Sequence, residues 1–124
     1  MTKHYLFVCS ANCDRSPTAE ELMREMAAEL ALDVEVRSAG LHVQDRYGPP
    51  SVQLTPELCD WADEVYVMEQ RHVEKVVGEY RQPAEKVRCL DVEDVYGRGS
   101  PELKRLLRPK LQAVLKAPGG PNST

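Results

Sequence analysis

A cysteine and an arginine stand six positions apart near the start of the chain, in the stretch "CSANCDRS". Cys9 ends an apolar run, and Arg15 precedes Ser16 and Pro17, two residue types that are typical of the start of a helix. A cysteine thiolate is a nucleophile, and a guanidinium can bind two oxygens of one phosphate group. The two side chains together therefore predict a site that binds a tetrahedral oxyanion and attacks it.

The loop between this cysteine and the predicted helix is long enough to surround such an anion. The backbone N–H groups of Ser10 through Arg15 can curl around a phosphate, and the N-terminus of a helix adds free N–H groups and a positive partial charge. The same positive field favours the Cys9 thiolate over the thiol. From the residue types alone one alternative stays open, in which Cys9 is a buried structural cysteine and Arg15 is solvated.

Short apolar runs alternate with helical patterns, and these elements must position the loop. The apolar runs predict strands over residues 4–8, 34–38, 64–68 and 86–90. The spacing of apolar residues predicts helices from residue 16 to about residue 30 and over residues 55–62, 69–80 and 101–116. Ser16, Thr55 and Ser100 are expected to cap three of these helices. The alternation predicts a parallel sheet, in which ligands bind beyond the carboxyl ends of the strands.

Composition and charge exclude several other classes of protein. With 124 residues, 42% of them hydrophobic, the chain fits one compact domain over residues 1–117, followed by a disordered tail over residues 118–124. The net charge of −4 gives no electrostatic reason to expect binding to nucleic acids or to anionic membranes. The first apolar stretch is too short for a signal sequence, so we expect a cytoplasmic protein with free thiols. The cysteines and histidines lack the spacing of a zinc site, and we expect no metal.

The stretch "FVCSANCDRSPTAEELM" (residues 7–23) resembles the active-site loop of the low-molecular-weight protein tyrosine phosphatases. The segments "RSAG" (residues 37–40) and "WADEVYVME" (residues 61–69) are similar to the family's second strand and to its acid-then-strand segment. The resemblance extends through about residue 97. It implies an α/β fold with a four-stranded parallel sheet flanked by helices on both faces, and a phosphatase that needs neither metal nor cofactor.

Carried over to this chain, the resemblance makes Cys9 the nucleophile and Arg15 the residue that clamps the phosphate. Asn12 would hold the loop in a left-handed backbone conformation, which asparagine tolerates. Ser16 would donate a hydrogen bond to the Cys9 sulfur. The phosphate-binding loop that the resemblance implies consists of Ser10, Ala11, Asn12, Cys13, Asp14, Arg15 and Ser16.

The leaving group of a phosphate ester needs a proton, and a carboxylic acid can supply it. The family supplies this acid as Asp-Pro-Tyr before the last helix, and this chain has "DVEDVYG" over residues 91–97 in that place. Asp94 matches best, although Val95 stands where the family has proline. Asp91 and then Glu93 are the alternatives for the general acid and base. An acidic, solvated loop without a catalytic role is the remaining interpretation.

Cys13 and Asp14 mark the place where the chain departs from the family's loop, which often has its second cysteine at the position of Asp14. This shift argues against a protective disulfide between Cys13 and the nucleophile. The Asp14 charge costs little near the bound anion if the side chain points outward. Tyr96 and Tyr47 are candidates for the wall of the substrate pocket. The segment 40–54 is shorter than in the family, which predicts an open pocket and weak selectivity for phosphotyrosine proteins.

The leading hypothesis is a metal-free phosphomonoester hydrolase, and the family indicates a protein tyrosine phosphatase with a phosphocysteine intermediate on Cys9. Its substrate would be a phosphotyrosine protein or a small aryl phosphate, and phosphate would be its product. One alternative is an arsenate reductase, which would need further thiols such as Cys59 and Cys89, although we expect both to pack in regular elements. The other is a non-catalytic, oxyanion-binding regulatory module. None of these roles involves His72, which we expect on the surface of a helix.

Overall fold

A four-stranded parallel sheet carries the candidate loop at the carboxyl ends of its strands. The computed structural model describes residues 2–43 and 51–116. The strands are β1 (Lys3–Cys9), β2 (Val34–Gly40), β3 (Glu64–Val67) and β4 (Val87–Cys89), in the spatial order β2-β1-β3-β4. The helices are α1 (Arg15–Glu29), α2 (Pro56–Trp61), α3 (Gln70–Gly78) and α4 (Pro101–Lys116), with a short 3₁₀ helix, η2 (Ala84–Lys86), before β4.

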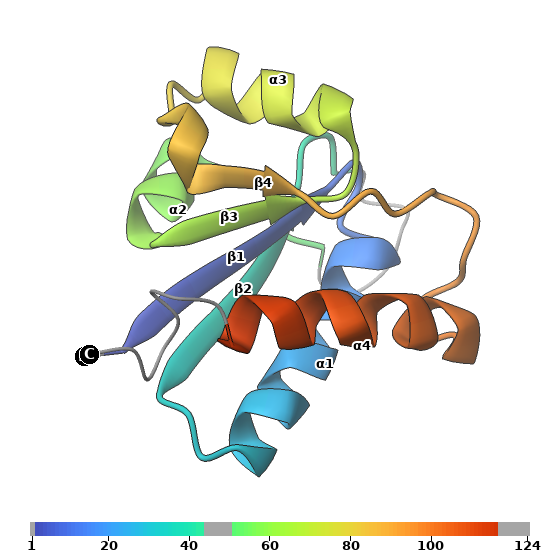
Figure 1. Ribbon diagram of the computed structural model, residues 1–124. Coiled ribbons are helices and arrows are strands. Elements are labelled where there is room, and N and C mark those ends of the chain that lie inside the picture. Colours follow the sequence, from blue (N-terminus) through green and yellow to red (C-terminus); the bar gives the residue numbers. More distant parts are fainter. Residues whose placement is uncertain (1, 44–50, 117–124) are drawn as a thin grey trace.

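Helices cover both faces of the sheet, so the predicted fold class is confirmed. Helices α1 and α4 lie side by side on one face, and α2 and α3 lie on the other (Figure 1). Strand β1 is buried on both faces: Tyr5, Phe7 and Cys9 belong to the core cluster with α1 and α4, whereas Leu6 and Val8 belong to the cluster with α2 and α3. A strand buried on both faces needs a continuous apolar run, which explains "YLFV".

The strand order reverses between β1 and β3, and this reversal places the site. The chain leaves β1 into α1 on one face and leaves β3 into α3 on the other face (Figure 1). The register pairs Val8 with Val67 and Cys9 with Gly40, so the strands end at the same side of the sheet. In open α/β sheets such a reversal opens a crevice beyond the carboxyl ends of the strands, where ligands bind.

Two of the three predicted helix caps are confirmed and one is wrong. Thr55 accepts a hydrogen bond from the Leu58 N–H, and Ser100 accepts one from the Leu103 N–H, each at 3.1 Å. Helix α1 instead begins at Arg15, and the residue at its N-cap position is Asp14, without a side-chain capping bond. Ser16 therefore lies inside the first turn, where its hydroxyl is free to serve the loop rather than the helix.

Helix α4 is amphipathic and packs on α1. Its buried residues are Leu103, Leu107, Leu111 and Leu115, which follow one face at helical spacing. These leucines belong to the same core cluster as the buried residues of α1. The packing of α4 on α1 therefore determines the position at which the preceding segment, residues 91–99, ends. Within residues 2–43 and 51–116, none of the helices has both the length and the apolar character needed to cross a membrane.

Candidate active site

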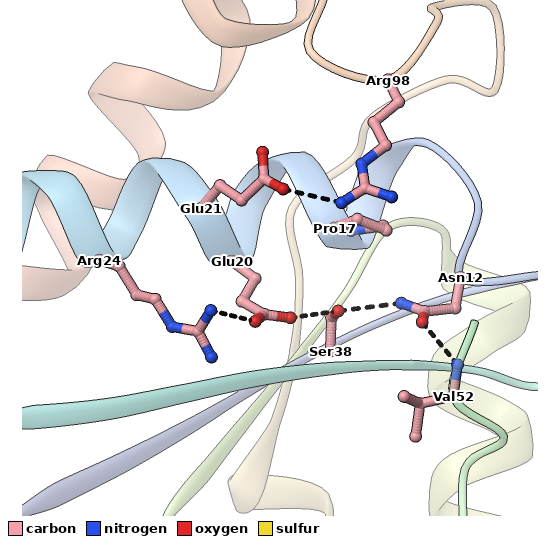
Figure 2. A pocket seen from close by; sticks show the side chains of 8 residues that line it. All are labelled: Asn12, Pro17, Glu20, Glu21, Arg24, Ser38, Val52 and Arg98. Carbon is pink, nitrogen blue, oxygen red and sulfur yellow. Dashed lines mark hydrogen bonds and ion pairs between the residues drawn. The ribbon is translucent and has the colours of Figure 1, made fainter. Parts of the chain in front are cut away.

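Asn12 fixes the shape of the loop over residues 10–14. Its φ is +53°, in the left-handed region that asparagine tolerates better than most residues. The buried side chain donates from Nδ2 to Ser16 Oγ and to Ser38 Oγ, each at 2.9 Å. Its Oδ1 accepts from the Val52 N–H at 2.8 Å (Figure 2). These contacts connect the loop to α1, to β2 and to the segment before α2, and they support the structural role predicted for Asn12.

A hydrogen-bonded chain continues from this asparagine into α1. Ser38 Oγ donates to Glu20 Oε1, and Arg24 Nη1 pairs with Glu20 Oε2 at 2.6 Å (Figure 2). This series of hydrogen bonds runs along a hollow of about 280 Å³ next to the loop. The hollow is lined by Asn12, Pro17, Glu20, Glu21, Arg24, Ser38, Val52 and Arg98. The charged groups of the hollow pair with one another, and Cys9 does not line it. This hollow is therefore not the candidate active site.

Gly40 leaves room for the loop to pass over the end of β2. A Cβ atom at this position would lie 2.6 Å from the carbonyl carbon of Ala11 and 2.6 Å from the backbone nitrogen of Asn12. Real side chains do not approach backbone atoms so closely, so either the loop or the strand would have to move. The glycine at the end of "RSAG" is thus required by the loop that rests on it.

Cys9 and Ser16 face each other beneath the loop. Their Sγ and Oγ atoms lie 3.0 Å apart, and the two residues are 2% and 0% exposed. Ser16 Oγ accepts a hydrogen bond from Asn12 Nδ2. The hydroxyl's own proton can go to the Cys9 sulfur at 3.0 Å or to the Ala39 carbonyl oxygen, which is more distant at 3.4 Å. A thiolate can only accept, so with Cys9 ionised the Ser16 hydroxyl donates to the sulfur.

Arg15 is buried and held by the protein through one end of its guanidinium. Its side chain is 1% exposed, and Nη1 donates to Glu69 Oε2 at 2.7 Å and to the Val92 carbonyl at 2.8 Å. Its Nε lies 3.7 Å from Asp94 Oδ1. Since Nη1 is occupied, Nε and Nη2 are the pair that can bind two phosphoryl oxygens in the fork geometry of arginine.

Glu69 is a site residue that the sequence analysis missed. Hydrogen bonds from Arg71 and from Arg15 lower its pKa to about 2, so it stays ionised at neutral pH. It follows the end of β3 after one residue, Met68, at the same side of the sheet as Cys9. A charged residue just beyond the end of a predicted parallel strand is a candidate for a binding site, and this signal in the sequence could have identified Glu69.

His72 is buried, so the prediction of a surface position is wrong. It is 0% exposed, its Nδ1 accepts from the Glu69 backbone N–H at 3.1 Å, and its Nε2 lies 3.0 Å from Ser10 Oγ. The side chain takes the place of the glutamate of a capping box at the start of α3, which is why it turns back into the protein. Burial, together with Arg15 and Arg71, lowers its pKa to about 4, so His72 is neutral at neutral pH.

This neutral histidine determines which way the Ser10 hydroxyl can donate. Because a backbone N–H donates to Nδ1, the ring proton must be on Nε2, from which it is donated to Ser10 Oγ. Arg71 Nη2 also donates to Ser10 Oγ, at 2.9 Å. Both lone pairs of the hydroxyl are then used, so its own proton is available to a bound anion.

Asp94 lies with the loop, whereas its two alternatives do not. A cavity of about 150 Å³ is lined by Cys9, Ser10, Ala11, Cys13, Asp14, Arg15 and Asp94. Asp91 and Glu93 instead line a separate hollow with Met68, Glu69, Gln70 and Val92. The Asp94 side chain is 59% exposed, so it stands at the mouth of the cavity rather than in the core. This placement favours Asp94 over the other two acids.

The remaining predicted residues are distributed differently. Tyr96 is partly buried against the core cluster of α1 and α4 and is not among the residues that line the cavity. Tyr47 lies outside the described residues. Cys13 lines the cavity, and burial together with the neighbouring Asp14 carboxylate raises the pKa of its thiol. Cys13 is therefore a weaker nucleophile at neutral pH than an ordinary cysteine.

Cys59 and Cys89 do not meet the candidate nucleophile in this cavity. Cys59 is buried in the cluster of α2 and α3, and burial raises its pKa to about 11. The Cys89 thiol donates to Asp91 Oδ1 at 3.2 Å. Both cysteines pack in regular elements as expected, and neither lines the cavity of Cys9.

Comparison with known proteins adds to this geometry. Residues 4–53 match the family described as low molecular weight phosphotyrosine protein phosphatase. A protein-arginine-phosphatase from Bacillus subtilis (strain 168) is 30% identical over 137 aligned positions, which cover 90% of this chain and 91% of that protein. The chain belongs to the low-molecular-weight phosphotyrosine protein phosphatase family. It is a phosphatase of this family, as the resemblance of residues 7–23 indicated.

Solved structures of family members share the fold. One is a YwlE arginine phosphatase, a cysteine-to-serine mutant with a phosphorylated active-site serine; its TM-score is 0.73 at 27% identity, with 91% of this chain and 96% of that chain covered. Another is a low molecular weight protein tyrosine phosphatase from T. tengcongensis, with a TM-score of 0.72 at 25% identity, covering 90% of this chain and 93% of that chain. Relatives with two different substrate names thus resemble this chain to a similar extent.

Proposed function

We propose that this phosphatase acts without a metal on phosphoarginine residues of proteins, with Cys9 as nucleophile, Arg15 as phosphate clamp and Asp94 as general acid and base. The observation that carries the proposal is that these three side chains line one cavity of about 150 Å³ at the carboxyl end of β1. The loop amides, the Ser10 hydroxyl and the free edge of Arg15 can donate to the three equatorial phosphoryl oxygens, where charge develops in the transition state.

The reaction would proceed in two displacements at phosphorus. In the first, the Cys9 sulfur forms a bond to phosphorus, the bond from phosphorus to the arginine nitrogen breaks, and Asp94 gives its proton to that nitrogen. In the second, Asp94 takes a proton from water, the water oxygen bonds to phosphorus, and the sulfur leaves as a thiolate. Ser16, 3.0 Å from the sulfur, would stabilise that thiolate in both steps. The net products are inorganic phosphate and the unmodified side chain.

The cavity's lining favours a cationic leaving group. Asp14 and Asp94 are both at the cavity, and no aromatic side chain is among its lining residues in the described part of the chain. The Asp14 carboxylate can bind a guanidinium through charge-assisted hydrogen bonds, and the protonated Asp94 can hydrogen-bond to the same group, whereas a phenyl ring would pack better against an apolar or aromatic wall. The name of the Bacillus subtilis relative, a protein-arginine-phosphatase, supports the same substrate class.

Phosphotyrosine, which was the leading expectation from the sequence, is the second candidate substrate. The family description and the similar T. tengcongensis structure favour it. A cavity of about 150 Å³ with an exposed mouth would also accept an aryl phosphate. The two candidates share the same chemistry at Cys9 and differ only in the leaving group.

Two phosphopeptides of one sequence, one with phosphoarginine and one with phosphotyrosine, separate these candidates. Both are assayed by phosphate release in the presence of a chelator, with the parent protein and with Cys9→Ala. We expect kcat/KM for the phosphoarginine peptide to exceed that for phosphotyrosine by at least tenfold, and Cys9→Ala to be inactive on both. The reverse order would assign the phosphotyrosine activity. Binding of phosphate without turnover of either peptide would indicate the non-catalytic module, and thiol oxidation that depends on arsenate would indicate the reductase.

A further inference from the structure

The segment that contains Asp94 is tied to the start of α1 by two backbone N–H groups. The Arg98 N–H donates to Asp14 Oδ1 at 2.9 Å, and the Gly99 N–H donates to Thr18 Oγ1 at 2.9 Å. Thr18 Oγ1 in turn donates to the Asp14 carbonyl at 2.7 Å. Residues 91–99 are here called the acid segment. The carboxyl-terminal end of this segment therefore rests on Asp14, at the end of the loop, and on Thr18, in the first turn of α1.

The other end of the acid segment is held from a different side. The Val92 N–H donates to the Met68 carbonyl at 2.8 Å, and the Val92 carbonyl accepts from Arg15 Nη1 at 2.8 Å. Val92 itself is 1% exposed. Between these two anchors Asp94 and Val95 are largely exposed, at 59% of the side chain and 68% of the residue. The position of Asp94 thus depends on the anchors rather than on packing of its own side chain.

We propose that Asp14 is a positioning residue for the reaction: its carboxylate holds the Arg98 N–H and so keeps Asp94 at the mouth of the cavity of Cys9. This inference rests on the proposed role of Asp94 as general acid. A valine at position 95 leaves the backbone more conformations than a ring-constrained residue would, so an anchor beyond it restricts where Asp94 can lie. Loss of one charge-assisted hydrogen bond at this anchor would let Asp94 leave the orientation that proton transfer requires.

Arg98 also provides a matched control, because its side chain and its backbone N–H have different partners. The Arg98 side chain makes a separate ion pair with Glu21, with Nη2 2.7 Å from Oε1 and both side chains about half exposed (Figure 2). Such exposed pairs contribute little. Glu21→Gln removes this pair but leaves the backbone bond to Asp14 in place, so we expect it to match the parent.

The test is the dependence of kcat/KM on the leaving group, with two substrates that carry neutral leaving groups: p-nitrophenyl phosphate, whose leaving group needs little protonation, and phenyl phosphate, whose leaving group needs more. We expect Asp14→Ala to lower kcat/KM for phenyl phosphate about tenfold while p-nitrophenyl phosphate changes less than about threefold. Asp14→Asn keeps the acceptor oxygen without the charge, so it should lower kcat/KM for phenyl phosphate less than Asp14→Ala does. Thr18→Val removes the second anchor and should act in the same direction as Asp14→Ala.

The background of Asp94→Asn separates this inference from the proposed function. If Asp14 acts through Asp94, Asp14→Ala has no further effect on the leaving-group dependence once Asp94 is replaced. Equal losses on both substrates, equal changes in Asp14→Ala and Asp14→Asn, or a persistent effect in the Asp94→Asn background would each overturn the positioning role. If Asp94→Asn itself leaves the leaving-group dependence unchanged, the assignment of Asp94 as the acid fails instead. Thermal unfolding of each variant confirms that the comparison is made on folded protein.

Discussion

The Glu69 carboxylate lies 2.7 Å from the Nη1 atom of Arg15, and this contact joins the segment after β3 to the loop after β1. Arg15 is almost fully buried, so its charge needs a partner inside the protein. Glu69 provides it through Nη1, so that Nε, which lies 3.7 Å from Asp94 Oδ1, and Nη2 still face the cavity side of the guanidinium where a substrate could bind. If Arg15 clamps the phosphate as proposed, it is oriented before any phosphate binds, which is the condition under which electrostatic stabilisation of a transition state is most effective.

Replacing Glu69 with glutamine should weaken catalysis without unfolding the protein. Glutamine keeps the size and one acceptor oxygen but removes the charge, so Arg15 loses part of its orientation. We expect kcat/KM to fall about tenfold or more, with a parallel loss of inhibition by inorganic phosphate. Glu79→Gln is the control, because its pair with Lys75 on α3 is exposed. Equal activity in the Glu69 and Glu79 variants would show that the buried pair does not prepare the clamp.

His72 should make the folded protein less stable as the pH falls from about 6.5 to about 4. Its pKa is lowered from 6.5 to about 4 by burial and by Arg15 and Arg71, so within this window the unfolded chain binds a proton that the folded protein excludes. The free energy of unfolding then decreases with decreasing pH, by an amount on the order of 3 kcal/mol for this group. Chemical denaturation at several pH values measures it. His72→Gln, which keeps a donor toward Ser10, should flatten the dependence; an unchanged slope would assign it to other groups.

Gly40→Ala should damage the loop and the fold together. The added Cβ would meet the backbone of Ala11 and Asn12 at 2.6 Å, and backbone cannot move aside as the end of a flexible side chain can. We expect a loss of roughly 1–3 kcal/mol in the free energy of unfolding, and a loss of activity because the loop amides shift. Gly78→Ala is the matched control, since nothing lies within 4 Å of its added Cβ. Similar behaviour of the two variants would mean that the loop does not rest on Gly40.

Asp14→Asn should distinguish the proposed substrate from the alternative one. The substitution removes a negative charge from the cavity lining but keeps the acceptor for Arg98. The loss of this charge should weaken the binding of a guanidinium leaving group but not that of a phenol. We expect kcat/KM for a phosphoarginine peptide to fall roughly five- to tenfold, with less than about twofold change on a phosphotyrosine peptide. A loss of the same size on both peptides would remove Asp14 from substrate selection.

Local signals predicted most of the fold. The run "YLFV" marks a strand buried on both faces, and the caps at Thr55 and Ser100 follow from residue type and position. The resemblance found the loop because its residues are contiguous. Asn12 then adopts the left-handed conformation that its residue type suggested.

What the sequence did not reveal depends on contacts between distant segments. Glu69 reaches Arg15 only because β1 and β3 are neighbours, and His72 is buried only because it turns back onto the loop at Ser10. A helical pattern places a histidine on a face but does not say what lies opposite. Ser16 was expected to cap α1, and its hydroxyl instead faces Cys9, since a side chain with two possible partners follows the tertiary structure.

The role of Cys9 as nucleophile is tested most directly by finding which residue carries the phosphoryl group during turnover. The parent protein, Cys9→Ala and Cys13→Ala are mixed with substrate, quenched in milliseconds and mapped by mass spectrometry. We expect a phosphoryl group on Cys9 in the parent and in Cys13→Ala, and neither a phosphoprotein nor turnover in Cys9→Ala. A phosphoryl group on Cys13, or undiminished turnover by Cys9→Ala, would contradict this role.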